Sequence, residues 1–355
     1  MAPRTRSRSR KGEESSGAAG AGLAGGSGGG VDGQRAGAAA REAGTAEKEK
    51  VVAGKFQLFP PPPVGHVVSE IVSPTYELVE YGEAPAVLQY NKFVETGYRA
   101  HLSTAQALAS FWHLHNESMN VWTHGGGFVF FLVLFIQGWT SFGFVDPIEY
   151  LLWTCQTSSA LICFFFSVSY HLFQCHGECS LTSYKAWLSY DLWGILYAYV
   201  ASSIRRVFYA LHCYPRLRNL CLIVTLVFAA GVLVTAVTGA LLASPKMRVA
   251  IFGALMVAAN LSTVFSLYLS AGSAEARQLH ILAIVLQVVG GTINATRMPE
   301  RILPSWIRRS FTDYYFNSHA IMHVVVGTSV YCTWIGCNAD WQWAMHSDAP
   351  CAGVV

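Results

Sequence analysis

Three histidines in apolar surroundings are the residues of this sequence best suited to chemistry. His319 and His323 are four residues apart, which places both imidazoles on one face of a helix, as in helical pairs of zinc ligands. His171 supplies a third imidazole from another apolar segment. Three histidines on Zn²⁺ leave the fourth position for water, the pattern of a catalytic site. Zinc lowers the pKa of that water to about 7.

Two further polar residues have positions that place them beside these histidines. Ser167 precedes His171 by four residues and so shares its helix face. Asp191 is the one charged residue within the apolar segments, where an ionisable group is costly and becomes a candidate for function. We expect Asp191 to orient or deprotonate the water, and Ser167 to hydrogen-bond a ligand or an oxyanion. A buried polar network of the same residues, without metal, stays open as the alternative.

A second set of potential ligands lies close together in the sequence. His171, Cys175, His176 and Cys179 fall within nine residues. Imidazole and thiolate both suit zinc, but the spacing differs from the paired-cysteine pattern of structural zinc sites. Cys175 and Cys179 also follow directly after an apolar segment, where S-acylation is a further alternative.

The elements that carry these residues are long apolar segments. Hydrophobic residues make up 52% of the 355-residue chain and charged residues 13%, against roughly 25% charged in an average globular domain. About 20 apolar residues suffice to cross a bilayer as a helix, and strict alternation, which a β-barrel needs, is absent. We predict an all-α integral membrane protein, a seven-transmembrane helix bundle with an intramembrane metal site. The predicted spans are 121–144, 150–174, 187–204, 219–243, 249–270, 279–296 and 319–337.

The direction of the spans places the candidate residues in one leaflet. Odd-numbered spans begin on the side where even-numbered spans end. His171 near the end of span 2, Asp191 near the start of span 3 and the histidine pair at the start of span 7 therefore lie on the same side. His280 begins span 6 and falls on the opposite side. His124 begins span 1 on the correct side but stands apart from the others, so we interpret it as an interfacial residue.

Loop charge predicts the orientation of the bundle. With a cytosolic N-terminus, the inner connections carry seven Lys and Arg residues and the outer connections carry five, and positive charge favours the cytosolic side. This orientation is opposite to that of a G-protein-coupled receptor. It puts Cys213, Cys337 and Cys351 on the outer side, where they could pair, and the sequence leaves the pairing open.

Composition divides the chain into four parts. We expect a disordered Gly/Ala-rich basic tail over residues 1–50 and a cytosolic N-terminal region with short helices over residues 51–120. The seven-transmembrane domain covers residues 121–337, and residues 338–355 form an extracytosolic C-terminal tail. The net charge of +3 is too small for the basic footprint of a nucleic-acid-binding protein. The expected partners are a membrane lipid or lipid-like ligand and, at the N-terminal region, a cytosolic signalling protein.

Five segments of the chain occur in an order and spacing that match a known family. They are His115–His124, Ser167-x3-His171, Tyr190–Ile195, Met298–Arg301 and Ser318-His319-x3-His323. With these segments the chain resembles the progestin and adipoQ receptor family, the adiponectin-receptor-like membrane proteins. The resemblance implies a seven-helix signalling receptor or regulator with a cytosolic N-terminus and a zinc ion held by His171, His319 and His323. It also implies Asp191 and Ser167 close to the metal, and a hydrolase-like site linked to ceramide-type amides.

The segment Glu95–Leu102 most resembles the Golgi member of this family that tethers Raf kinase. This likeness implies an alternative function: a Golgi membrane scaffold that restrains MAP kinase signalling through its cytosolic N-terminal region, with zinc only structural. It also favours the Golgi over the plasma membrane as the location.

Three features depart from the family pattern. Leu192 stands where relatives usually carry an aromatic residue. Arg205 and Arg206 occupy positions where relatives have small or apolar residues, and we expect them to shorten span 3 or to reach the outer headgroups. The triplet Gly125–Gly127 is expected to loosen the start of span 1 or to allow close packing. These departures affect the expected ligand more than the metal site.

Overall fold

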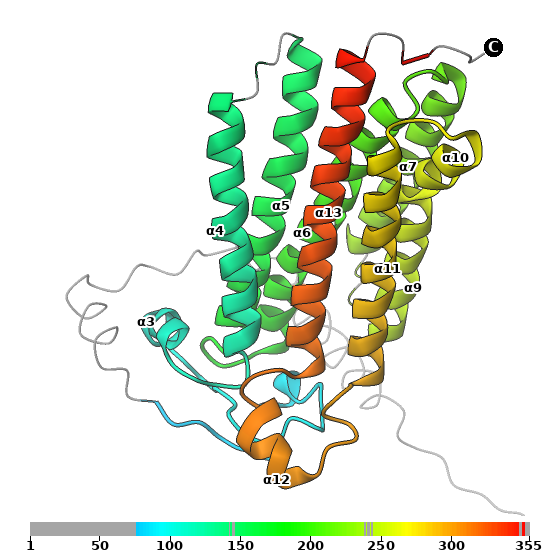
Figure 1. The fold of residues 1–355 in the computed structure, drawn as a ribbon. Coiled ribbons are helices and arrows are strands. Elements are labelled where there is room, and N and C mark those ends of the chain that lie inside the picture. Colours follow the sequence, from blue (N-terminus) through cyan, green and yellow to red (C-terminus); the bar gives the residue numbers. More distant parts are fainter. Residues whose placement is uncertain are drawn as a thin grey trace, which may run out of the picture. The chain divides into compact units, whose positions relative to one another are not determined.

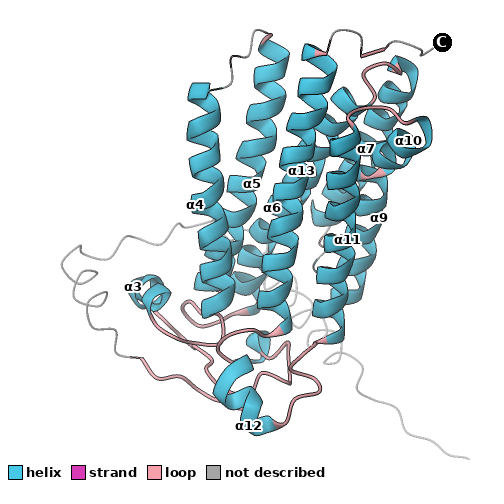
Figure 2. Cartoon of the chain, in the orientation of Figure 1, coloured by secondary structure: helices cyan, strands magenta, loops and turns pink. Residues whose placement is uncertain are grey.

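The computed structural model describes residues 76–141, 143, 146–237, 239, 242, 244–347, 350 and 351. The predicted tail over residues 1–50 and residues 51–75 of the predicted N-terminal region lie outside these residues. Within the described residues the fold is helical, and extended pairing is limited to two isolated bridges, Val79 with Tyr98 and Leu102 with His176 (Figure 2). The predicted all-α class is confirmed.

Seven helical segments of the described chain correspond to the seven predicted spans (Figure 1). The fifth segment is interrupted at Asn260, which separates α9 from α10. Six segments are long and apolar enough to cross a membrane. The helix outside that set is α6, which carries Lys185, Asp191, Arg205 and Arg206. The segments are α4 (Ser118–Ser141), α5 (Pro147–Phe173), α6 (Leu181–Ala210), α7 (Pro215–Val237), α9 (Pro245–Ala259) with α10 (Leu261–Leu269), α11 (Ala274–Thr296) and α13 (Ser318–His346).

Polar residues at the segment boundaries explain where several of these helices begin. The side chains of Asp146, Ser180, Ser273 and Asn317 each accept a hydrogen bond from a backbone N–H in the first turn of α5, α6, α11 or α13. Such N-caps stabilise a helix by about 1 kcal/mol. The cap at Asn317 fixes the start of α13 and therefore the depth of the two histidines that follow it.

Small residues let the central helices approach closely. A Cβ atom added to Gly194 of α6 would lie 2.8 Å from the Cα atom of Cys163 in α5. Close helix approach through small residues is typical of membrane bundles. This contact sets α6, which carries Asp191, directly against α5, which carries His171.

A cap of short helices and loops covers one end of the bundle, at the bottom of Figure 1. It contains η1 (Ala86–Leu88), α3 (Thr104–Ala109), η2 (Ser110–Trp112), α12 (Ser305–Ile307) and η3 (Arg308–Thr312). The carboxylate of Asp313 accepts hydrogen bonds from the backbone N–H groups of Glu95 and Thr96, at 2.9 and 2.8 Å. The cap thus ties the chain before α4 to the chain before α13.

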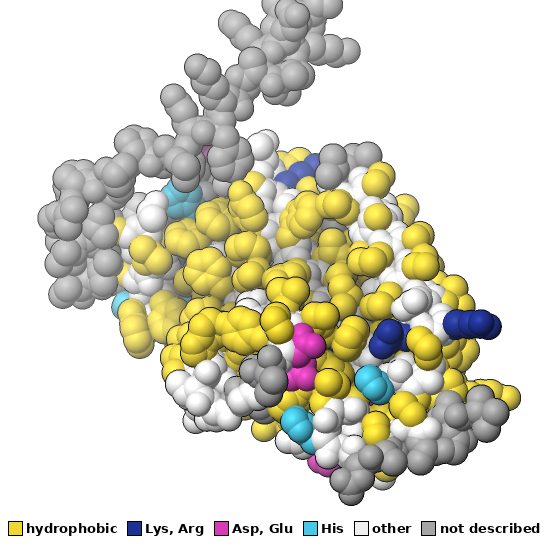
Figure 3. All heavy atoms as spheres, turned by 90° about the horizontal axis from the view of Figure 1, so that it is seen from above, with side chains coloured by type: hydrophobic (Ala, Val, Ile, Leu, Met, Phe, Trp, Pro, Cys, Tyr) yellow, Lys and Arg dark blue, Asp and Glu magenta, His cyan; other side chains and the backbone are white. Residues whose placement is uncertain are grey.

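The opposite end of the bundle carries the disulfide Cys213–Cys351. Cys337, the third of the candidate cysteines, is a buried free thiol in α13. Figure 3 looks onto this end, and hydrophobic side chains occupy most of its described surface. Of the three candidate cysteines, the two that pair are therefore Cys213 and Cys351, which lie outside the helices.

The expectation for Arg205 and Arg206 is wrong. Neither residue ends the helix, because α6 continues to Ala210. Neither side chain reaches the headgroups, because both residues are buried, with 1% and 4% of their surface exposed. Neighbouring helices supply hydrogen-bond partners for both arginines, so these charged residues can be buried inside the bundle. The helix therefore continues beyond the end of its apolar run in the sequence. The helix α13 is likewise longer than its apolar run: it continues nine residues beyond the predicted end at 337, to His346.

Candidate metal centre

His171, His319 and His323 form one cluster where α5 ends and α13 begins. One ring nitrogen from each residue lies within 4.8 Å of the others. The ring centroids of His171 lie 5.2 Å from His319 and 5.0 Å from His323. The three side chains predicted to share one leaflet therefore meet, and the group could hold a metal ion.

Each imidazole is oriented by a hydrogen-bonding partner at its Nδ1 atom. For His171 this partner is the Glu117 carboxylate, at 2.8 Å. For His319 it is the side-chain oxygen of Asn294 on α11, at 3.2 Å, and for His323 it is the Thr123 hydroxyl on α4, at 3.5 Å. Contacts of this kind fix the ring and leave Nε2 for a metal.

The donor set fits zinc. The Nε2 atom of His171 is buried and has no hydrogen-bond partner among the described residues. An unpaired buried polar atom costs free energy, and a metal ligand bond would remove that cost. Three neutral imidazoles are a known zinc donor set, with Zn–N distances of about 2.0–2.1 Å.

Glu117 belongs to the site but was not predicted as a site residue, because it precedes the first predicted span, which begins at residue 121. It lies one residue before α4, is 4% exposed, and accepts hydrogen bonds from the Tyr90 hydroxyl and from Asn120 at 2.6 Å. Burial alone would raise its pKa, but the hydrogen bonds from His171, Tyr90 and Asn120 outweigh burial and hold the pKa well below its ordinary value. The carboxylate therefore stays charged. Its position within the His115–His124 segment was the one signal available in the sequence.

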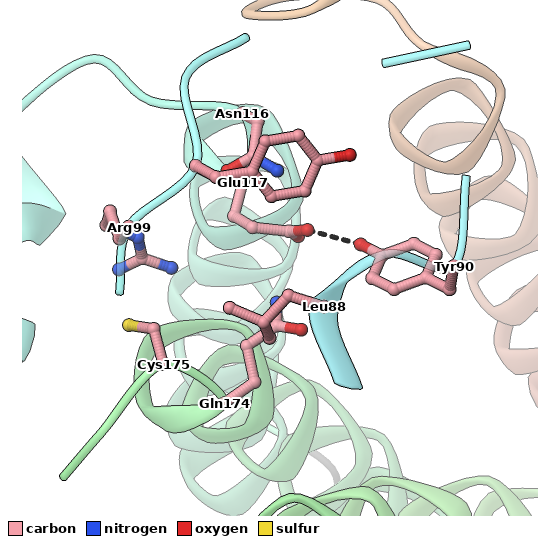
Figure 4. Close-up of a pocket in the computed structure, with 8 residues that line it drawn as sticks. Leu88, Tyr90, Arg99, Asn116, Glu117, Gln174 and Cys175 are labelled. Carbon is pink, nitrogen blue, oxygen red and sulfur yellow. Dashed lines mark hydrogen bonds between the residues drawn. The ribbon is translucent and has the colours of Figure 1, made fainter. Parts of the chain in front are cut away.

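Figure 4 shows the surroundings of this carboxylate. Tyr90 and Glu117 point toward each other and are joined by a hydrogen bond, and both line a cavity of about 10 Å³, the room of about one water molecule. Arg99 comes from the cap and donates to the backbone oxygen of His171 at 2.6 Å. A cation on the last carbonyls of a helix stabilises its C-terminus. The segment Glu95–Leu102 thus holds the end of α5 in place.

Asp191 and Ser167 lie together next to the histidines. Ser167 is buried, its hydroxyl hydrogen-bonds the Asp191 carboxylate, and Asp191 interacts electrostatically with His171. The structure therefore places the two predicted polar residues against each other, with Asp191 within electrostatic reach of His171. Their catalytic roles stay predictions.

The interpretation of His124 as an isolated interfacial residue is wrong. Its ring stacks on that of His323, with centroids 3.6 Å apart and planes inclined by 13°. It also meets Phe164 edge-on at 5.1 Å. His124 is a fourth histidine at the site, packed against His323. Its depth could be predicted from the sequence, but its rotation toward α13 could not.

The local set of His171, Cys175, His176 and Cys179 forms no joint metal group within the described residues. The Cys175 thiol donates to the Leu172 carbonyl and the Cys179 thiol to the Cys175 carbonyl. Cys175 and Cys179 are also buried, with 1% and 5% exposed, so neither is accessible to S-acylation in this conformation.

A second buried polar group lies at the disulfide end, and we call it the arginine cluster: Arg205, Arg206, His280 and Asp340. Arg205 donates to the side chains of Gln156 and Asn338 at 2.5 and 2.7 Å. Arg206 donates to the Ala259 carbonyl, and His280 contacts the Asp340 carboxylate at 3.1 Å. These side chains join α5, α6, α9, α11 and α13.

Comparison with known proteins agrees with this architecture. Residues 112–334 match a family described as haemolysin-III related. The human progestin and adipoQ receptor family member 4 is 32% identical over 280 residues, which cover 77% of this chain and 96% of that protein. Mouse member 3 is 27% identical over 264 residues, covering 72% and 83%. The adiponectin receptor protein of Drosophila melanogaster is 23% identical over 269 residues, covering 73% and 58%. The 112–334 match includes Glu117 and all three clustered histidines.

Proposed function

Because this multi-pass membrane protein belongs to the haemolysin-III related family, together with the progestin and adipoQ receptors, we propose that it is a signalling receptor or regulator with an intramembrane zinc site that hydrolyses ceramide-type lipid amides. The observation that carries the proposal is the buried cluster of His171, His319 and His323, with the Nε2 atom of His171 unpaired. Bound zinc supplies a Lewis acid that acidifies water and polarises a carbonyl oxygen.

The chain's own residues then have separate tasks. Glu117 orients His171 and balances the charge of the site through its 2.8 Å contact. Asp191 accepts a proton from water. Once protonated, Asp191 can donate to the Ser167 oxygen, which frees the single Ser167 hydroxyl proton to hydrogen-bond the oxygen of the amide as negative charge develops on it. Ser167, Asp191 and the three histidines belong to helices of the bundle, which suits a substrate that resides in the bilayer.

The disulfide supports the proposed orientation. Disulfides persist in oxidising compartments and are rare in the cytosol. The Cys213–Cys351 bond therefore favours an extracytosolic location for the disulfide end and a cytosolic one for the cap and the histidine cluster. Whether the membrane is that of the Golgi or the plasma membrane stays a prediction.

A turnover assay tests the enzymatic proposal. Full-length protein in detergent is incubated with short-chain ceramide, and the released fatty acid is measured for wild type and His171→Ala. His346→Ala serves as the control, because His346 is an exposed histidine on α13. We expect hydrolysis by wild type and the control and its loss in His171→Ala. Equal rates for all three proteins would remove the enzymatic proposal.

One observation favours the scaffold alternative as a second function. The cap exposes large apolar side chains, with Trp112 at 75%, Leu108 at 41% and Leu78 at 40% exposure. Such side chains suit a protein partner. Because Arg99 of the cap holds His171, deleting residues 51–115 would disturb both functions. Trp112→Ser separates them: it should weaken binding of a Raf kinase to the protein and leave zinc bound, whereas Asp191→Ala should leave that binding intact.

A further inference from the structure

A groove between α4 and α13 leads from the outside of the bundle to the histidine cluster. Its volume is about 320 Å³, at the lower end of the range of about 300–1,000 Å³ for ligand pockets. Thr123 and His323 line it together with apolar residues of α4, α5 and α13. The groove therefore connects a proposed metal ligand with the surface of two membrane-spanning helices.

Glycines create the space. Gly126 and Gly127 of α4 and Gly327 of α13 line the groove. A Cβ atom added to Gly126 would meet nothing within 4 Å, whereas one added to Gly127 or Gly327 would lie 3.2 or 3.9 Å from the Phe164 ring. Phe164 of α5 is thus the floor, and any larger side chain at these three positions would occupy the groove. The triplet Gly125–Gly127 shapes a surface without interrupting α4.

The two ends of the groove differ in polarity. Thr123 and His323, whose Oγ1 and Nδ1 atoms are 3.5 Å apart, form a polar end. Phe130 of α4 and Tyr331 of α13 close the other end, with ring centroids 5.1 Å apart in an edge-on contact. From His323 to Tyr331 the helix rises about 12 Å. The groove is therefore an apolar trough with a polar end at the metal centre and an aromatic stop.

The open side of the groove faces the bilayer. Phe130 and Val324 on its rim are 43% and 48% exposed, and both belong to helices long and apolar enough to span a membrane. A trough that opens onto hydrocarbon and has apolar walls is complementary to hydrocarbon. Its volume and single aromatic stop suit one chain rather than the two chains of an intact bilayer lipid.

We propose that the α4–α13 groove binds one acyl chain of a membrane lipid amide, which enters sideways from the bilayer and presents its polar linkage to His323. This inference rests on the proposed function, because it takes the histidine cluster as the reacting centre. The apolar walls favour any hydrocarbon chain. The contact between Phe130 and Tyr331 closes the groove and therefore limits the length of the chain that fits.

The test uses full-length protein in phosphatidylcholine bilayers and a ceramide whose N-acyl chain carries a diazirine at mid-chain. After illumination, the labelled peptides are mapped by mass spectrometry. We expect labels on the segments 126–131 and 324–331. Gly126→Leu should reduce labelling about tenfold, because displacing about two methylene contacts weakens binding by roughly that factor. Gly291→Leu is the matched control, since Gly291 of α11 also has nothing near its Cβ position and does not line the groove.

Other outcomes overturn the inference. Equal labelling of wild type and Gly126→Leu, or labels on other helices, would exclude the groove. Labelling by diazirine palmitate but not by the ceramide would show a site for free acid instead. Thr328→Trp, at an exposed position on the rim, repeats the test if Gly126→Leu does not fold. Zinc content is measured in each sample. If wild-type protein without zinc is labelled on the expected segments, the metal site is refuted and the acyl-chain site is retained.

Discussion

The histidine cluster and the arginine cluster are both buried and polar, yet they satisfy their polar atoms in different ways. In the arginine cluster, Arg205 donates to two side chains, and His280 and Asp340 contact each other. Among the described residues, the unpaired atoms there, His280 Nδ1 and the Nε atoms of Arg205 and Arg206, come from one imidazole and two guanidinium groups, which do not form a shared donor set for a metal. In the histidine cluster, the protein contacts the outer nitrogen of each ring, and the inner nitrogens converge. We interpret the first as a structural link between helices and the second as a ligand site.

One helix serves both clusters. Asp191 lies near the start of α6, and Arg205 and Arg206 lie near its end. α6 lies outside the set of apolar spans, yet Gly194 packs it tightly against α5. A polar transmembrane helix is tolerated because its neighbours supply hydrogen-bond partners. We therefore expect substitutions in the histidine cluster to reduce metal binding and substitutions in the arginine cluster to reduce stability.

The largest expected effect is on bound zinc. His319→Ala and His323→Ala should each reduce zinc from about one ion per chain to almost none, because two imidazoles do not complete the site. His280→Ala, in the arginine cluster, should keep its zinc. Elemental analysis of the purified proteins measures this. Loss of zinc in His280→Ala with retention in His319→Ala would reverse the assignment of the two clusters.

The next effect is on stability. Arg205→Ala leaves Gln156 and Asn338 without a buried charged donor and should lower the free energy of unfolding by about 3 kcal/mol. Arg216→Ala, an exposed arginine at the same end, should change it by less than about 0.5 kcal/mol. Denaturant unfolding in detergent measures both. A stable Arg205→Ala protein that has lost zinc would contradict the structural role.

A smaller effect is expected from the residue that orients His171. Glu117→Gln keeps the size of the side chain but removes the charge, and should weaken zinc affinity about 10- to 100-fold without unfolding the protein. Competition with a chelator measures the affinity. Glu178→Gln, an exposed carboxylate at the same end, is the control and should bind as wild type. An unchanged affinity in Glu117→Gln would show that the Glu117–His171 contact only packs the helices.

The smallest effect concerns the cap. Burial would raise the pKa of Glu95, but hydrogen bonds from Ser305, Arg308 and Arg309 outweigh it and lower the pKa from 4.5 to about 2. Because the folded pKa is the lower one, this contact stabilises the cap above about pH 4.5 and is lost as the pH falls toward 2. The protection factor for hydrogen exchange over residues 305–312, which corrects for the intrinsic rate at each pH, should therefore fall at low pH in wild type. In Glu95→Gln it should already be low at neutral pH, and a wild-type protection factor there would refute the role of this carboxylate.

The seven helical segments and the cluster of three histidines could be predicted from the sequence, because hydropathy and an i, i+4 spacing are local signals. Glu117 could not, since it precedes α4 and its burial comes from the cap and α5. The arginine cluster was missed for a related reason: hydropathy ends a span where charge begins, whereas Gln156 and Asn338 from other helices permit Arg205 inside the bundle. His124 depended on the rotation of α4, which only packing fixes.

The central claim is a zinc ion on three imidazoles, and X-ray absorption at the zinc edge of full-length wild-type protein tests it most directly. We predict about one zinc per chain with nitrogen ligands at about 2.0–2.1 Å, and an altered spectrum in His171→Ala. Purified, folded protein that contains no zinc and does not take it up on addition would contradict the claim.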